Sequence, residues 1–122
     1  MYEIFIQTRI SSAHYLPGYP GPCRELHGHN WVIKASAQCD ELNDLGMGVD
    51  FKFLKENLDE ICRELDHIVL NEIDYFKEHS PTSENVARYL FEKLGARIND
   101  GRVRVSEIEV RETPGSGAIY RE

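Results

Sequence analysis

The stretch CRELHGHNWVIKASAQ, Cys23 to Gln38, combines a regular alternation of side chains with a cluster of possible metal ligands. The alternation begins after Asn30, and its apolar members are Trp31, Ile33, Ala35 and Ala37. A period of two places alternate side chains on the same side of an extended chain. The stretch therefore predicts a β-strand that turns one apolar face toward a core.

Two imidazoles stand at the start of this strand. His27 and His29 are separated only by Gly28, so on a strand both side chains can reach one ion with little between them. Zinc suits neutral imidazoles best among the common metals. His14, near the end of the preceding strand, is the third candidate ligand. Three protein ligands would leave one position open, which is typical of catalytic zinc.

Two other interpretations of this region stay open. HGH is also compatible with a turn that exposes two unligated histidines. Cys23, four residues before His27, is either a free thiol or a fourth ligand that closes the site as a structural one. Because zinc protects a thiol that it binds, labelling the thiol with and without metal separates these two roles.

The remaining periodicities predict three more strands. Residues 1–10 alternate in the same way as the quoted stretch, and residues 117–121 form a short last strand. In the third strand, Val103 and Val105 have odd numbers whereas Ile108 and Val110 have even ones. This change of parity predicts a β-bulge near Ser106 and Glu107.

Two helices are predicted between the second and third strands. The first follows Asp50, a candidate N-cap, and its apolar residues recur at helical spacing at Leu54, Leu58, Ile61 and Leu65. The second has Ser80 or Thr82 as its cap and Pro81 in its first turn. Gly95 is expected to end it. The predicted fold is α+β, a four-stranded antiparallel sheet with both helices on one face.

Length and composition fit a single domain over residues 1–122. Fourteen basic and twenty-one acidic side chains give a net charge of −7, which argues against general attraction to nucleic acid or anionic membranes. The N-terminal residues lack the apolar run of a signal peptide or membrane span, so a cytoplasmic protein is expected. Three cysteines are too few and odd in number for a disulfide framework, so reduced thiols are expected.

Asp66 and His67 follow the first helical stripe directly. An acid beside an imidazole can fix its tautomer and stabilise imidazolium, which indicates a general acid/base unit. Neighbouring residues on a helix do not face each other, so this pairing requires the helix to break there. The alternative is a histidine placed favourably at a helix C-terminus beside a solvated aspartate.

Glu112 continues the even-numbered face of Ile108 and Val110, so the pattern points its carboxylate toward a buried side. A buried carboxylate needs hydrogen-bond donors. A ligand edge with two adjacent N–H groups would satisfy both oxygens. If the strand ends before Glu112, the group is only hydrated, and both possibilities stay open.

Several motifs together resemble the 6-pyruvoyl-tetrahydropterin synthase family over nearly the whole chain. They are His14, CRELHGH (23–29), VDF (49–51), LDH (65–67), PTSEN (81–85), RET (111–113) and GAIYR (117–121). The three-residue gap between Cys23 and His27, Leu26 before HGH, and the ending AIYRE are most similar to its 6-carboxytetrahydropterin synthase branch. That branch belongs to the queuosine (7-deazaguanine) pathway, which supplies a precursor for tRNA modification.

The resemblance implies a fold and an assembly. In the tunnelling fold, three subunits close their sheets into a barrel and two barrels stack as a hexamer, with sites at subunit interfaces. It also implies Zn²⁺ bound by His14, His27 and His29. The protein would then be a homo-oligomer with a small-molecule pterin substrate and no nucleic-acid or membrane partner.

The resemblance further implies roles for the remaining candidates. Cys23 would be the catalytic base, with Asp66 and His67 as its relay. Glu112 would bind the 2-amino and N3 edge of the pterin. The pterin would also contact Thr82 and Ser83 of a neighbouring subunit.

The implied reaction is that of a zinc-dependent lyase. It converts 7,8-dihydroneopterin 3'-triphosphate to 6-carboxytetrahydropterin, triphosphate and acetaldehyde, with zinc as a Lewis acid. One alternative is a 6-pyruvoyl-tetrahydropterin synthase, which stops after triphosphate elimination and internal redox. Another is a non-catalytic, zinc-containing oligomer that binds a pterin without consuming it.

Overall fold

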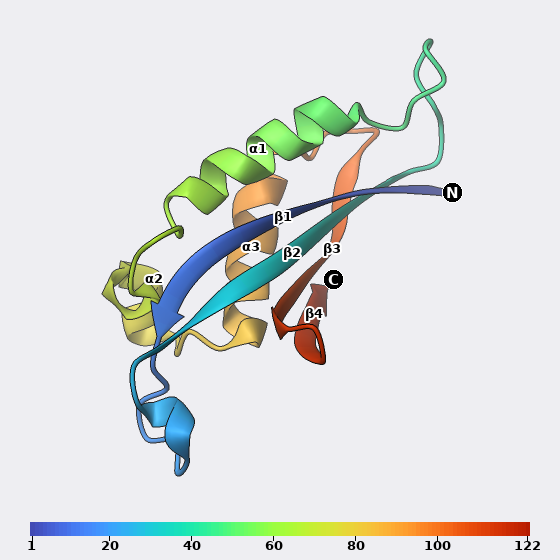
Figure 1. Ribbon diagram of the computed structural model, residues 1–122. Helices are drawn as coiled ribbons and strands as arrows, with labels where there is room; N and C mark the ends of the chain where they lie inside the picture. The colour runs from blue at the N-terminus through green and yellow to red at the C-terminus, as the bar shows by residue number, and fades with distance from the viewer.

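The computed structural model describes residues 1–122 and contains one antiparallel sheet in the order β1-β2-β3-β4 (Figure 1). Its strands are β1 (Tyr2–His14), β2 (His27–Cys39), β3 (Arg104–Thr113) and β4 (Ser116–Arg121). The two long strands β1 and β2 pair along their whole length. All four predicted strands are therefore confirmed.

Three helices accompany the sheet, one more than predicted. They are α1 (Phe51–Arg63), α2 (Asp74–Glu78) and α3 (Ser83–Ile98), and two single 3₁₀ turns are η1 (Pro22–Arg24) and η2 (Leu70–Glu72). The additional helix α2 has only five residues and buries Phe76 alone. A helix this short has no periodic stripe, so hydrophobic spacing could not predict it.

The predicted helix starts are confirmed, but the predicted end of α3 is wrong. Asp50 caps α1 by accepting a hydrogen bond from the Lys52 backbone N–H, and Thr82 caps α3 in the same way. Pro81 lies before the Thr82 cap rather than in the first turn. Helix α3 continues through Gly95 to Ile98, because Ile98 is buried in the core and packing holds the last turn.

The core lies between the sheet and helices α1 and α3, which cover the same face (Figure 1). Even-numbered residues of β1 and odd-numbered residues of β2 point into it, as the alternation predicted. The predicted bulge is confirmed, because Ser36 pairs with Glu107 while Ala37 pairs with Val105, leaving Ser106 unpaired.

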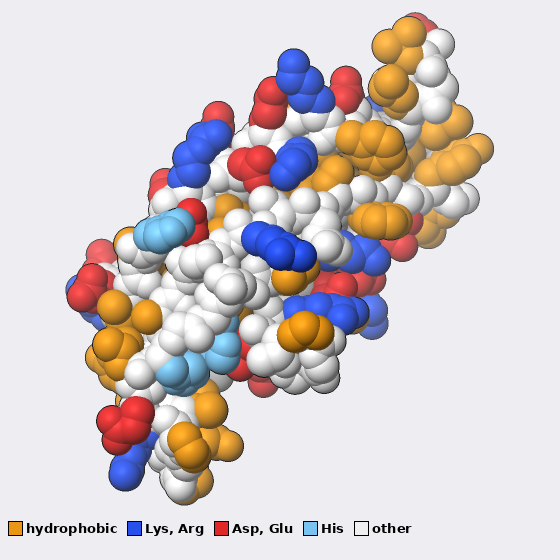
Figure 2. All heavy atoms as spheres, viewed as in Figure 1, with side chains coloured by type: hydrophobic (Ala, Val, Ile, Leu, Met, Phe, Trp, Pro, Cys, Tyr) orange, Lys and Arg blue, Asp and Glu red, His pale blue; other side chains and the backbone are white.

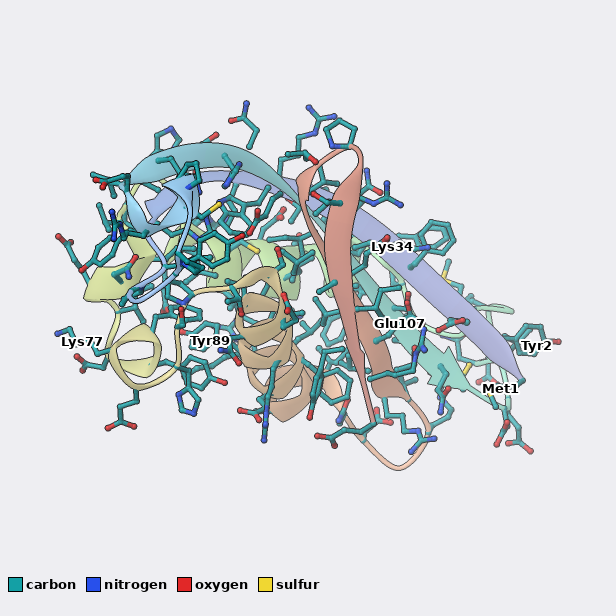
Figure 3. The ribbon with its side chains drawn as sticks, turned by 90° about the horizontal axis from the view of Figure 1, so that it is seen from below. Met1, Tyr2, Lys34, Lys77, Tyr89 and Glu107 are labelled. Atoms are coloured by element: carbon teal, nitrogen blue, oxygen red, sulfur yellow. The ribbon has the colours of Figure 1, made fainter.

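The other face of the sheet is not covered by helices. Lys34 lies over the exposed Phe5 ring, 4.3 Å from its centroid, and Glu107 binds Arg121. Figure 3 shows Lys34 and Glu107 along the strands, whereas Tyr89 lies at α3. Strands β1 and β4 are the two free edges. None of the helices combines the length and hydropathy needed to cross a bilayer.

Candidate functional site

Strand pairing brings three histidines together at one end of the sheet. His14 is directly opposite His27 in the β1–β2 register, and Ser12 is opposite His29. All three imidazoles therefore project from the core-facing side, with ring centroids 4.5 to 5.1 Å apart. One nitrogen from each ring lies within 4.8 Å of the other two. This convergence of His14, His27 and His29 matches the predicted ligand set.

Backbone carbonyls fix two of these rings. The Nδ1 atoms of His14 and His27 lie 2.7 Å from the carbonyl oxygens of Pro81 and Glu25. A carbonyl oxygen can only accept, so each Nδ1 carries the proton and donates it. Each ring then keeps an unprotonated Nε2, as metal-binding histidines do when a backbone group holds the other nitrogen.

The orphaned nitrogens show that the site fits a metal ion. The Nε2 atoms of His14 and His29 are buried and have no hydrogen-bond partner. Burial lowers the pKa of both His14 and His29, which keeps these imidazoles neutral at neutral pH. Neutral, unpartnered nitrogens that converge are suited to a divalent cation. The indole of Trp31, which is fully buried, packs edge-on against both rings.

Gly28 does not act as the sequence suggested. A Cβ placed there would meet only the Ser12 carbonyl oxygen, at an ordinary 3.9 Å. Alternation turns this position to the opposite face of the sheet from His27 and His29. The space between the two imidazoles therefore does not depend on the glycine.

Cys23 lies outside the histidine group. It belongs to η1, its side chain is half-buried and makes no hydrogen bond, and its backbone carbonyl accepts from Leu16. Its sulfur is not among the three clustered ligand atoms. This arrangement favours a free thiol over a fourth ligand. The other two cysteines are buried, and burial raises the pKa of Cys62 to about 12.

Asp66 and His67 pair with each other, and the predicted break in the helix is present. Helix α1 ends at Arg63, and His67 has a positive φ of 58°, a conformation that lets adjacent side chains meet. The Nδ1 of His67 lies 2.9 Å from the Oδ2 of Asp66. The turn is tied to β1 because Asp66 Oδ1 accepts from the Ser11 N–H at 2.7 Å. That hydrogen bond lowers the pKa of Asp66.

The pair and the thiol are not in contact within one chain. No hydrogen bond joins Cys23 to Asp66 or His67, and η1 and the turn after α1 lie at different places around the end of β1 (Figure 1). His67 instead lines an open hollow of about 700 Å³ that also includes Gly28, His29 and Asn30. On the face of the molecule seen in Figure 2, histidine side chains lie at two separate places.

Glu112 faces the histidines. Strand β3 continues to Thr113, so the strand does not end before Glu112, and a register shift between Arg111 and Thr113 leaves this residue without a pairing partner in β4. Its Oε1 lies 3.9 Å from His14 Nε2 and its Oε2 lies 3.6 Å from His29 Nε2. The carboxylate is 26% exposed and has no hydrogen-bond donor. The prediction that it points toward the buried side is confirmed.

Thr82 and Ser83 lie close to the site because they directly follow Pro81 in the chain. Thr82 uses its hydroxyl to cap α3, and Ser83 is buried in its first turn. Pro81, which precedes them, holds His14. Sequence reasoning missed the roles of Pro81, Glu25 and Ser11 because each acts through backbone atoms, which leave no side-chain pattern.

A family model, curated relatives and a solved structure point to one family. The family model described as 6-pyruvoyl tetrahydropterin synthase matches residues 3–122. A 6-carboxy-5,6,7,8-tetrahydropterin synthase of Synechocystis is 37% identical over 98% of this chain and 93% of its own, and one of Bacillus subtilis is 31% identical over 98% and 85%. The solved structure of Caenorhabditis elegans 6-pyruvoyl tetrahydropterin synthase is 28% identical in sequence. The match covers 99% of this chain and 95% of that chain, with a TM-score of 0.88.

Proposed function

The chain belongs to the 6-pyruvoyl tetrahydropterin synthase family, and we propose that it is a zinc-dependent 6-carboxy-5,6,7,8-tetrahydropterin synthase. Its substrate would be 7,8-dihydroneopterin 3'-triphosphate, and its products 6-carboxytetrahydropterin, triphosphate and acetaldehyde. The two relatives of that name, which match almost the whole chain, support this choice. The observation that carries it is the convergence of three imidazoles beside a carboxylate and a thiol-bearing turn.

The proposal gives each residue a task. His14, His27 and His29 would hold Zn²⁺, which supplies Lewis acidity to the hydroxyl groups of the substrate side chain. Glu112 would bind the two adjacent N–H groups of the pterin. Cys23 as thiolate would remove a proton from the side chain.

The relay is proposed to return that proton. In the Asp66–His67 pair, the carboxylate holds Nδ1 and leaves Nε2 free to exchange a proton with a thiol or with solvent. Because the pair does not contact Cys23 of its own chain, we propose that a neighbouring subunit supplies it, in a trimer or hexamer. Thr82 and Ser83 would contact the pterin across the same interface. The reaction would take place in the cytoplasm, on the route to queuosine.

Incubation of the zinc-loaded protein with dihydroneopterin triphosphate tests the proposal. Mass analysis should identify 6-carboxytetrahydropterin, and a coupled assay should detect acetaldehyde. Formation of 6-pyruvoyltetrahydropterin without acetaldehyde would instead establish the second candidate, which the similarity to the C. elegans enzyme favours. Binding of the pterin without any product would reject both enzymes and leave a binding protein.

Two substitutions separate the metal from the chemistry. Cys23→Ala should keep zinc and fold but lose turnover, whereas His27→Ala should lose zinc as well. His79→Ala is the matched control, because His79 is exposed, stacks on Tyr75 and is not one of the three clustered histidines. Full activity in Cys23→Ala would contradict the assignment of the base.

A further inference from the structure

The turn that carries Cys23 has few bonds to the rest of the chain. It is η1, which lies in a loop, residues 15–26, that projects beyond the ends of β1 and β2 (Figure 1). None of the residues of η1 is buried. Within the loop, the Leu16 N–H donates to the Cys23 carbonyl oxygen at 2.9 Å. That hydrogen bond ties the turn back to the residues that leave β1.

Asn71 holds the start of this loop from another segment of the chain. Its Oδ1 accepts from the Tyr15 N–H at 3.1 Å, and its Nδ2 donates to the Tyr15 carbonyl oxygen at 2.9 Å. Apart from the Glu25 carbonyl that accepts from His27, these are the only hydrogen bonds between residues 15–26 and the rest of the chain. Asn71 is only 9% exposed, so its amide would be costly to leave without these partners.

The Asn71 side chain prolongs a contact between backbones. The segment after α1 runs beside the end of β1, where the Ala13 N–H donates to the Ile68 carbonyl oxygen and Ala13 forms a parallel bridge with Val69. Tyr15 lies two residues further along, beyond the end of the strand, and bonds to a side-chain amide instead of a backbone. A side-chain amide offers the donor and the acceptor of a peptide group, so Asn71 continues the pairing past the last residue of β1.

We propose that Asn71 is a positioning residue for Cys23. It fixes the backbone of Tyr15, and the next residue, Leu16, bonds the backbone of Cys23. The place of the thiol is thereby set from η2, on the other side of the end of β1. This hold on η1 does not depend on any substrate. Its importance for turnover rests on the proposed function, in which Cys23 removes a proton and must be placed accurately to do so.

Amide hydrogen exchange in Asn71→Leu tests the hold on η1 without any turnover. The substitution removes both hydrogen bonds to Tyr15 but no atom of the bond between Leu16 and Cys23. Exchange at the Leu16 amide, followed by NMR, should nevertheless become at least about tenfold faster, because that bond loses its support. Core amides of the sheet should keep their protection.

Two further variants complete the exchange experiment. Asn71→Asp keeps the volume and the acceptor but loses the donor, so it should also release the Leu16 amide and serves if Asn71→Leu does not fold. Asn99→Leu is the matched control. It removes a 2.7 Å bond from the Val105 N–H to a side-chain oxygen, and Asn99 has no hydrogen bond to residues 15–26. The Leu16 amide should be unaffected in this control.

Turnover tests the consequence for the reaction. A displaced base does not prevent substrate binding, so both Asn71 variants should lower kcat at least about tenfold while KM changes less than about twofold. Zinc affinity should stay at the wild-type value, because His14 keeps its pairing with His27 and its bond to Pro81. Asn99→Leu should alter none of these quantities.

The outcomes are distinct. Unchanged exchange at the Leu16 amide in the Asn71 variants would overturn the proposal. Equal acceleration at the core amides would also overturn it, because that result indicates general destabilisation, and so would a normal kcat despite faster exchange. Loss of zinc would place the effect at His14 and count against the proposal as well. If the wild-type protein makes no product, the proposed function fails, while faster exchange confined to the loop still supports the hold of Asn71 on η1.

Discussion

Cys23 differs from the other two cysteines in its accessibility. Its side chain is half-buried in η1, whereas Cys39 and Cys62 are buried in the core and the pKa of Cys62 is raised to about 12. A thiol reagent such as DTNB should therefore label one cysteine rapidly in the native protein and all three after denaturation. Cys23→Ser should abolish the rapid phase.

The same experiment decides whether the thiol binds the metal. If Cys23 is free, zinc leaves the rapid phase in place. Protection of Cys23 by zinc, with release of the protection by a chelator, would contradict its role as the base and restore the closed structural site as the better interpretation.

Asp66 should contribute to stability through its bond to β1. Its carboxylate accepts from the Ser11 N–H, and this bond joins the turn after α1 to the sheet. Asp66→Asn replaces a charged acceptor by a neutral one and should cost about 1 kcal/mol, which lowers the melting temperature by about 4 °C. Asp59→Asn is the control, because Asp59 makes only an exposed pair with Lys55 and should have little effect.

The sign of the pH dependence follows from the lowered pKa of Asp66. The folded state favours the ionised carboxylate, so its stabilisation is complete above the ordinary value of 3.8 and is lost as the pH falls through the lower folded value. Thermal melts of the wild type and Asp66→Asn should therefore differ at pH 7 and converge in acid. A constant difference across this range would show that the variant acts by another route.

At the scale of elements, Thr82 has a structural role in addition to its proposed substrate contact. Its hydroxyl caps α3, and the preceding carbonyl of Pro81 holds His14. Thr82→Ala should lower stability by about 1 kcal/mol and weaken metal binding, whereas Thr82→Ser should preserve both. Thermal melts and zinc competition measure the two effects. An unchanged melting temperature in Thr82→Ala would leave substrate contact as its only role.

The sequence predicts well those elements in which buried residues recur at a regular spacing. The four strands and the starts of α1 and α3 were predictable because alternation and capping residues are local signals. The end of α3 was not, since Gly95 favours a stop but the buried Ile98 and its contacts keep the helix going. Tertiary packing outweighed a local preference there.

The candidate site was predictable in composition but less so in arrangement. Two-residue spacing identifies His27 and His29, and strand order suggests His14. The carbonyls that hold the rings and the register shift that aims Glu112 depend on the pairing of distant segments. In the proposed function, a meeting of Asp66 and His67 with the thiol would also depend on contacts with another chain.

At the scale of the whole molecule, two features favour assembly with further copies. Strands β1 and β4 have unpaired edges, and such edges readily pair with another chain. Large apolar side chains are exposed at the end of the sheet opposite the histidines, among them Met1, Tyr2, Leu45 and Phe51. Figure 2 shows this gathering of apolar side chains, and Figure 3 marks the same end with Met1 and Tyr2. An exposed apolar patch of this kind is typical of an interaction surface.

Mixing two inactive variants tests whether the site is shared between subunits. Cys23→Ala lacks the proposed base and His67→Ala lacks the relay, so each assembly alone should be inactive. If each site takes its thiol from one chain and its relay from the next, co-refolding of equal amounts should restore about one quarter of the sites in a symmetric ring. Light scattering should show a mass that is a multiple of the 14.1 kDa chain.

The control for this experiment is a mixture in which both substitutions are in the same chain. Cys23→Ala/His67→Ala co-refolded with wild type supplies the same total number of intact residues and should also be active in about one quarter of its sites. Activity in this control, but none in the mixture of single variants, would mean that thiol and relay must come from one chain. Because Cys23 and His67 make no contact within the chain, that result would require η1 or the turn after α1 to move toward the other on substrate binding.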